Sequence, residues 1–280
     1  MQKCMPRMLA ATLDLHPSGE HVPAMPSRRQ FLSLVSRVAA ASVPATARAN
    51  PASSHAKPAK IRAICFDLFT LFDPRSVARA AEALFPGRGT ELWNAWKTRQ
   101  FEYAWLRAVG RRYVDFEAVT EAALVYAAQD QQLSLPTQAR RQLVDAYCDL
   151  EPWPDARPAL LAWRQAGLKL APLANYSPRM LRRLVSRNGL EPMFDALISS
   201  DAARTYKPDP RAYALGPSRL GLPAEQIAFS AFGGWDAAGA EWFGFPTFWV
   251  NRLGVTAEQL VPPRASGPDL ASLASWIAAR

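Results

Sequence analysis

The stretch that decides the fold is Cys65-Phe66-Asp67-Leu68-Phe69-Thr70-Leu71-Phe72-Asp73. It places a carboxylate, Asp67, directly after the apolar run Ile61–Phe66, which has the composition of a buried strand. A buried charge without a partner is costly, and open α/β folds bind ligands at the carboxyl ends of their parallel strands. Asp67 is therefore a candidate nucleophile or metal ligand. The alternative is an aspartate that only caps a turn.

Further apolar runs follow, and helical patterns separate them. The expected strands are residues 61–66, 168–173, 196–199, 227–230 and 247–250. Strands that alternate with helices at short spacing indicate a doubly wound parallel sheet. The first two strands are separated by a helical pattern from Val77 to Arg164, so a helical insertion is expected behind the first strand. The insertion is rich in aromatic residues; most fit helical core packing, but some could line a pocket.

The composition and the distribution of charge bear on one class of function, nucleic-acid binding. The chain has 280 residues, of which 49% are apolar and 20% are charged, as in ordinary soluble proteins. Its net charge is +9, but the first 49 residues hold six basic and two acidic residues, which leaves a diffuse surplus of +5. This distribution argues against nucleic-acid binding.

The positions of the histidines and cysteines further restrict the kinds of catalysis and metal binding that the predicted fold can support. The histidines are His16, His21 and His55, all before the first strand, so imidazole catalysis and histidine-ligated metals are excluded from the predicted fold. Cysteines stand at Cys4, Cys65 and Cys148 without metal-ligand spacing, and we interpret them as packing residues rather than a disulfide.

The N-terminal region is interpreted as an export signal. Ser27-Arg28-Arg29-Gln30-Phe31-Leu32 has the form of a twin-arginine motif, and a short apolar run ends at Ala47-Arg48-Ala49. We expect cleavage after Ala49, a flexible lead-in over residues 50–60, and a periplasmic protein without a membrane anchor. Translation can also begin at Met25. The alternative is a disordered basic tail.

Three more polar residues fall at strand ends. Asn175 precedes Ser177-Pro178, a helix start whose amides favour an anion. Lys207 lies in the turn Tyr206-Lys207-Pro208-Asp209-Pro210, and Asp236 follows the Gly233-Gly234 pair. A capped helix, a surface lysine and an N-cap are the respective alternatives. Together with Asp67 the four residues predict a shared site.

These segments resemble the haloacid dehalogenase superfamily, and within it the L-2-haloacid dehalogenases, from about residue 61 to residue 253. The resemblance implies a Rossmann-like core (residues 61–73 and 153–280), a helical cap (residues 74–152) and no cofactor or metal. It implies that Asp67 displaces halide from a short 2-haloacid with inversion, forming an ester that water hydrolyses to a 2-hydroxy acid. A homodimer is compatible with the sequence, which does not decide the oligomeric state.

The resemblance also implies residue roles. Lys207 keeps Asp67 ionised, and Asp236 steadies Lys207 and orients water. The remaining positions are expected to hold substrate or halide or to support the site, namely Thr70, Lys97, Ala174, Asn175, Tyr213 and Trp235.

This sequence departs from the family pattern at several positions. The loop after Asp67 lacks a glycine, which changes the turn that presents Thr70. Lys97 stands where an arginine is usual, and Ala174, Ala231 and Gly233 replace polar residues. One alternative function is therefore a catalytically silent relative that binds a small anion or a partner protein. A phosphatase of the same superfamily is disfavoured, because Phe69 occupies the position of its second aspartate.

Overall fold

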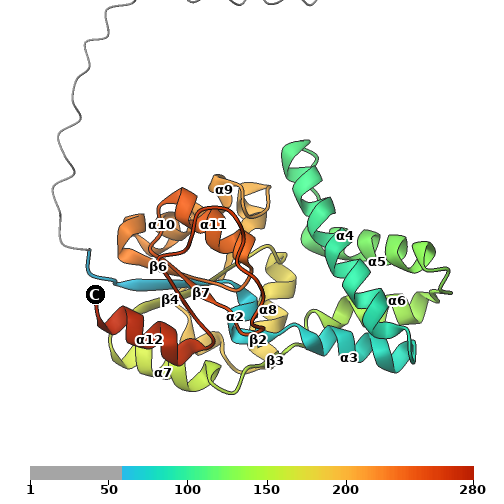
Figure 1. Ribbon diagram of the computed structural model, residues 1–280, viewed down its shortest axis with the longest axis horizontal. Coiled ribbons are helices and arrows are strands. Elements are labelled where there is room, and N and C mark those ends of the chain that lie inside the picture. The colour runs from blue at the N-terminus through green and yellow to red at the C-terminus, as the bar shows by residue number, and fades with distance from the viewer. Residues whose placement is uncertain (1–58) are drawn as a thin grey trace, which may run out of the picture. The chain divides into compact units, whose positions relative to one another are not determined.

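The computed structural model describes residues 59–280, and its core is a six-stranded parallel sheet in the order β5-β4-β1-β6-β7-β8 (Figure 1). The strands are β1 (Ala63–Phe66), β4 (Lys169–Ala174), β5 (Ile198–Ser199), β6 (Ile227–Ala231), β7 (Thr247–Val250) and β8 (Ala265–Gly267). β1 lies between β4 and β6 and is parallel to both. This arrangement confirms the predicted α/β fold and brings the carboxyl ends of the strands to one edge.

The sequence predicted five of the six strands to within two residues, including the edge strand β5, and missed the other edge strand, β8. β8 reads Ala265-Ser266-Gly267 and is only partly buried, so no apolar run marks it. The inner strands are buried on both faces and therefore read as continuous apolar runs.

Helices cover both faces of the sheet, and β1 shows how side chains divide between them. Ile64 and Phe66 pack on the side of α7 (Ala156–Gln165), α8 (Pro178–Arg187) and α12 (Leu270–Ala278). Ala63 and Cys65 pack on the side of the remaining core helices. These are α9 (Pro210–Tyr213), α10 (Leu215–Leu220) and α11 (Gly234–Phe243). Alternate residues of a strand point to opposite faces, which explains the division.

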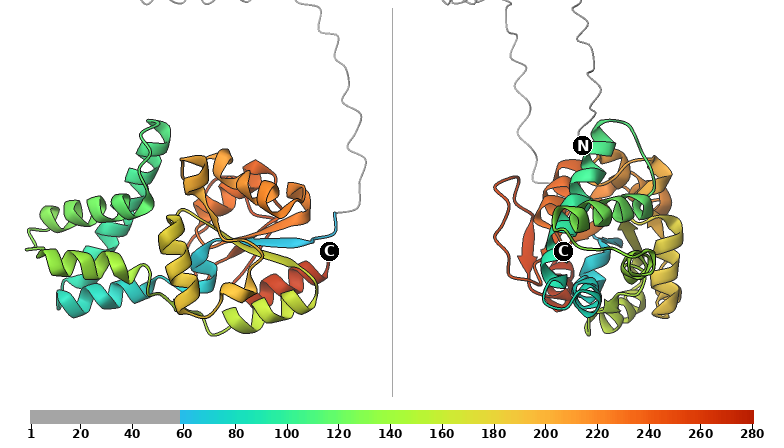
Figure 2. Two further views of the ribbon diagram at one scale, coloured as in Figure 1. Left: turned by 180° about the vertical axis from the view of Figure 1, so that it is seen from behind. Right: turned by 90° about the vertical axis from the view of Figure 1, so that its right-hand side faces the viewer.

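The helical insertion forms a separate layer beside the core (Figure 2). It consists of α3 (Arg75–Leu84), α4 (Gly89–Val109), α5 (Phe116–Asp130) and α6 (Thr137–Ala146), and we call it the cap. The chain enters the cap through β2 (Phe72–Asp73) and returns through β3 (Glu151–Pro152), and these two strands pair antiparallel. The sequence did not predict this ribbon, because each of its strands has only two residues.

Cys65 and Cys148 are free thiols in buried positions, as packing residues should be. Cys4, the export signal with Met25 and Ala49, the three histidines and most of the lead-in lie outside the described residues. Among residues 59–280, no helix is both long enough and apolar enough to cross a membrane.

Candidate active site

The four polar strand-end residues meet at one edge of the sheet. The Lys207 ammonium donates to Asp67 Oδ2 and to Asp236 Oδ2, each at 2.7 Å. Its main-chain amide donates to Asn175 Oδ1 at 2.8 Å. Lys207 is 1% exposed and Asp236 is fully buried. Two carboxylates therefore compensate one buried ammonium, and they raise its pKa above the ordinary lysine value against the opposing effect of burial.

Asp67 both caps a turn and faces Lys207. It is the N-cap of the short helix α2 (Leu68–Leu71), and its Oδ1 accepts the Phe69 amide at 2.9 Å. Its Oδ2 accepts from Lys207. The two interpretations of this aspartate from sequence are thus compatible: one oxygen fixes the side chain, and the other belongs to the charged cluster.

Thr70 does not reach the cavity. Its hydroxyl donates to the main-chain oxygen of Asp67 at 2.7 Å, and its side chain is fully buried. The expected contact with substrate is therefore corrected to a contact that closes the turn. The missing glycine explains the change: no positive φ angle occurs over residues 67–73 of the described chain, so the turn is helical rather than left-handed.

The same turn is held from the far side by two residues near the ribbon. Trp153 donates its indole N–H to the Phe69 carbonyl at 3.0 Å. Arg252, 7% exposed at its side chain, donates to the Thr70 carbonyl at 2.8 Å and pairs with Asp155 at 2.8 Å. Buried carbonyls at the end of a short helix need such donors. These contacts fix the position of the Asp67 backbone.

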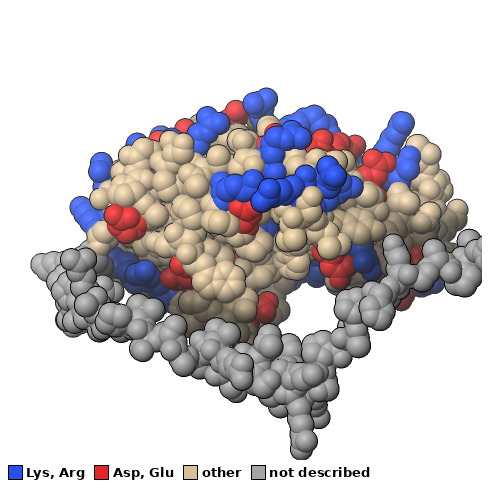
Figure 3. Space-filling view, turned by 90° about the horizontal axis from the view of Figure 1, so that it is seen from above, with Lys and Arg blue, Asp and Glu red and all other residues tan. Residues whose placement is uncertain are grey.

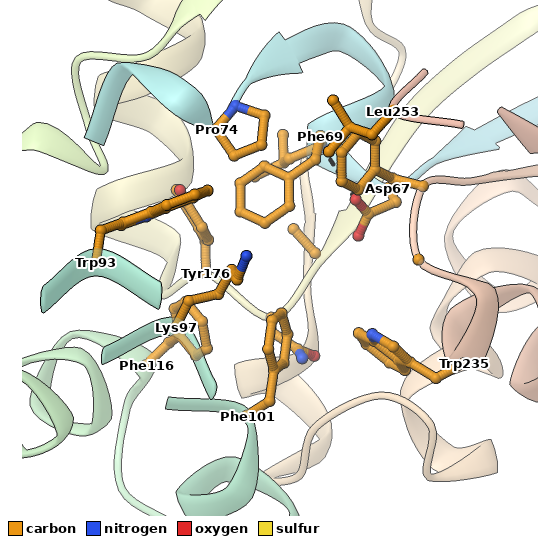
Figure 4. A pocket seen from close by; sticks show the side chains of 15 residues that line it. Asp67, Phe69, Pro74, Trp93, Lys97, Phe101, Phe116, Tyr176, Trp235 and Leu253 are labelled. Atoms are coloured by element: carbon orange, nitrogen blue, oxygen red, sulfur yellow. Dashed lines mark hydrogen bonds between the residues drawn. The ribbon is translucent and has the colours of Figure 1, made fainter. Parts of the chain in front are cut away.

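An apolar cavity of about 140 Å³, partly open to solvent, lies in front of Asp67 (Figure 4). Its polar side chains are Asp67, Lys97 and Asn175. Its apolar lining comes from Phe69, Pro74, Trp93, Phe101, Phe116, Tyr176, Phe232, Trp235 and Leu253. Leu68, Ala174 and Gly233 complete its lining. An apolar cavity with a few convergent polar groups is the usual form of a small-molecule site.

Lys97 reaches this cavity from α4 of the cap, as Figure 4 shows. Its ammonium lies 4.2 Å from the centre of the Trp93 ring, and no carboxylate within residues 59–280 forms an ion pair with it. Partial burial lowers its pKa below the ordinary lysine value. Arg99 is directed elsewhere, toward Glu102 and the Tyr126 ring. Lys97 is thus a cation available to a ligand.

The helix that follows β4 begins directly after Asn175 and Tyr176, which line the cavity. Ser177 is the N-cap of α8 and accepts the Met180 amide at 3.3 Å, and Pro178 is its first residue. The positive end of this ten-residue helix therefore lies beside Ala174 and Asn175, where it favours an anion.

Two expected site residues lie behind the cavity rather than in it. Tyr213 is fully buried and donates to Asp236 Oδ1 at 2.6 Å, so it supports the charged cluster and does not touch a ligand. Asp236 has both oxygens occupied, by Tyr213 and by Lys207, and it is not part of the lining. The expectation that it orients water is not supported. Burial raises the pKa of Asp236 to about 6.

Most of the aromatic lining was not predicted residue by residue from the sequence. Trp93 and Phe101 belong to the aromatic-rich insertion, and Trp235 was expected as a site residue. Phe69, Tyr176 and Phe232 each lie within two residues of a noted polar residue or glycine, which is the signal that could have found them. Among residues 59–280, no three histidine, cysteine or acidic side chains are grouped as a metal site would require.

Comparison with known proteins defines the class of this site. The family model of the haloacid dehalogenase-like hydrolases matches residues 61–244, and the chain belongs to this family. The (S)-2-haloacid dehalogenase of Pseudomonas sp. (strain YL) is 43% identical over 201 residues, which cover 71% of this chain and 87% of the relative.

Solved structures of L-2-haloacid dehalogenases also superpose on this chain. The L-2-haloacid dehalogenase RSc1362 superposes with a TM-score of 0.76 at 44% identity, covering 78% of this chain and 99% of the other. The L-2-haloacid dehalogenase of Xanthobacter autotrophicus, solved with chloropropionic acid covalently bound, superposes with a TM-score of 0.73 at 36% identity, covering 78% and 98%.

Proposed function

We propose that this chain hydrolyses short 2-haloalkanoic acids to 2-hydroxy acids, with release of halide, through an ester on Asp67. The observation that carries the proposal is the series of hydrogen bonds that joins Tyr213, Asp236, Lys207 and Asp67 and ends at an apolar cavity. The relatives named above, one of them with chloropropionic acid covalently bound, support it.

The first step is displacement at carbon. Asp67 attacks the carbon that bears the halogen, a carbon–oxygen bond forms, and the halide leaves with the electron pair of the broken bond. Lys207 holds the Asp67 carboxylate in place before the attack by donating to its Oδ2. The aromatic walls keep water from solvating the attacking carboxylate, which strengthens its charge interactions.

The second step is hydrolysis. Water adds to the ester carbonyl of Asp67, the acyl–oxygen bond breaks, and the 2-hydroxy acid leaves. One water oxygen is then part of the Asp67 carboxylate, and a proton passes to solvent. Lys207 stabilises the charge that develops on the ester carbonyl oxygen, because its ammonium is within hydrogen-bond distance of that carboxyl group.

The anionic ends of the substrate and products need positive potential. The start of α8, beside Ala174 and Asn175, receives the substrate carboxylate. Lys97 accepts the departing halide from the cap side, assisted by Asn175 and Trp235 at the cavity wall. A single ammonium can replace an arginine here, although it lacks the planar fork of a guanidinium.

The test is halide release from L-2-chloropropionate by the wild-type chain and by Asp67→Asn. The variant should lose at least about 10⁴-fold in rate, as expected when a covalent nucleophile is removed. Single turnover in ¹⁸O water should label Asp67 in the wild-type protein. No halide release from chloro-, bromo- or fluoroacids by a folded wild-type protein would identify a silent relative instead.

We also propose export through the twin-arginine route, which rests on the Arg28-Arg29 pair, the apolar run that follows it and the Ala47-Arg48-Ala49 pattern. Replacing both by lysine should abolish the appearance of mature protein in the periplasm, measured by cell fractionation. Undiminished export of the Arg28→Lys/Arg29→Lys variant would contradict the proposal.

A further inference from the structure

A second hollow lies between the cap and the core, outside the cavity in front of Asp67. It has a volume of about 340 Å³ and is lined by Arg111, Arg112, Tyr113, Arg204 and Arg211. The first three belong to the connection between α4 and α5 in the cap, whereas Arg204 follows the 3-10 helix η3 (Ser200–Ala203) and Arg211 is on α9. Basic side chains gather over the middle of the face that carries α9 and the end of α4 (Figure 3).

Most of this charge has no carboxylate partner among residues 59–280. Arg211 pairs with Asp209 at 2.5 Å. Within residues 59–280, Arg111, Arg112 and Arg204 form no ion pair, in contrast to most arginines of the cap helices. Three uncompensated guanidiniums around one hollow repel one another and create a positive potential that an anion would relieve.

The walls of the hollow are fixed to each other. Tyr113 donates to Asp201 at 2.6 Å, and its ring packs on that of Tyr206 at 5.2 Å. The Tyr206 hydroxyl donates to the Val114 carbonyl, and the Arg204 guanidinium lies 5.0 Å from the Tyr113 ring centre. The arginines from the cap and from the core are thus presented by backbone segments that contact each other directly.

Two of these arginines also have an uncommon backbone conformation. Arg111 and Arg204 have φ angles of 54° and 48°, in the left-handed region that favours glycine, asparagine or aspartate. Strained non-glycine residues of this kind persist only where the surrounding structure holds them. Here both present a guanidinium to the same hollow.

We propose that this hollow binds a tetrahedral oxyanion of charge −2, of the phosphate or sulfate type. Guanidinium groups match the oxygen geometry of such anions and bind them with paired hydrogen bonds, which a monovalent halide cannot accept. Bound there, the anion joins Arg111 and Arg112 of the cap to Arg204 and Arg211 of the core. Lys207 lies between the two core arginines in sequence, so the anion also fastens the cap to the segment that holds Lys207.

The experiment is calorimetric titration and thermal unfolding of the full chain with inorganic phosphate, with sulfate, and with potassium chloride at matched ionic strength. Phosphate and sulfate should bind once per chain and raise the unfolding temperature saturably, whereas chloride should not. Arg112→Gln/Arg204→Gln should weaken oxyanion binding by about tenfold or more. Preference for one of the two oxyanions identifies the closer analogue of the natural ligand.

Two controls make the result decisive. Arg141→Gln/Arg182→Gln removes the same charge from exposed arginines on α6 and α8 and should leave oxyanion binding unchanged. Lys97→Met tests the cavity in front of Asp67 and should also leave it unchanged. Equal loss in the matched control, loss only with Lys97→Met, or an equal effect of chloride would each overturn the proposal.

Discussion

The two sides of the cavity in front of Asp67 differ in kind. The core side presents charges that hydrogen-bond to one another within the protein: Lys207 donates to Asp67 and Asp236, and Asp236 accepts from Tyr213. The cap side presents aromatic rings and a single ammonium, Lys97, which lies on a ring and pairs with no carboxylate of the described chain. The core therefore fixes the reacting group before a ligand arrives, whereas the cap leaves its charge for the ligand.

The strongest test of the core side is Asp236→Asn. Lys207 would lose one of its two buried counter-charges and would hold Asp67 less firmly, so kcat for halide release should fall by about 10²-fold or more, with a smaller change in KM. Steady-state kinetics checks this. Because Asp236 does not touch the cavity, a change confined to KM would contradict the division between the two sides.

The matching test of the cap side is Lys97→Met, which removes the ammonium and keeps an unbranched apolar side chain. Loss of one charge-assisted contact with the leaving halide amounts to about 1.5–3 kcal/mol, or roughly 10- to 150-fold in kcat/KM. Lys97→Arg is the control and should retain most activity. Thermal stability should change little in either variant, because no carboxylate among residues 59–280 pairs with Lys97 and its one charge contact is with the Trp93 ring; a large loss of stability would show that Lys97 has a structural role.

The pH dependence sharpens the comparison further. Asp236 has a pKa of about 6 because it is buried, so below pH 6 its neutral form dominates and Lys207 loses a counter-charge. The rate should therefore fall up to about tenfold per pH unit below pH 6. A profile of kcat from pH 4.5 to pH 8 measures this, and Asp236→Asn should lack the limb; the same limb in that variant would assign it to another group.

The same pKa has a consequence for stability. The folded protein binds this proton more tightly than the unfolded chain, where an aspartate has a pKa near 3.8. The contribution of Asp236 to the free energy of unfolding therefore decreases as the pH rises from about 4 to about 6. At a pH where Asp236 is ionised, its contribution to the free energy of unfolding is therefore smaller than at low pH, where it is neutral.

The core side was largely predictable from sequence, and the cap side was not. Asp67, Asn175, Lys207 and Asp236 each follow an apolar strand, and a parallel sheet must bring such positions to one edge. The distance of 2.7 Å between Lys207 and Asp67 agrees with that expectation. Which cap aromatics line the cavity depends on how α4 packs, and its apolar residues do not lie on a single face.

Thr70 and Arg252 show a second limit of prediction from the sequence. The missing glycine was visible in the sequence, but its effect, a helical turn with the Thr70 hydroxyl on the Asp67 carbonyl, depends on contacts from residues far along the chain. Arg252 reaches the Thr70 carbonyl across 182 positions of sequence. No local pattern encodes such a contact, so a residue can be matched by resemblance without its role being known.

The ribbon of β2 and β3 has a consequence for how such a protein can change over time. Both crossings between core and cap run side by side through four paired residues. An insertion whose two ends are already adjacent imposes no new loop closure on its host. The cap can therefore be lengthened, rebuilt or exchanged as one cassette while the sheet and its charged cluster stay as they are, and new substrates can be acquired without new chemistry.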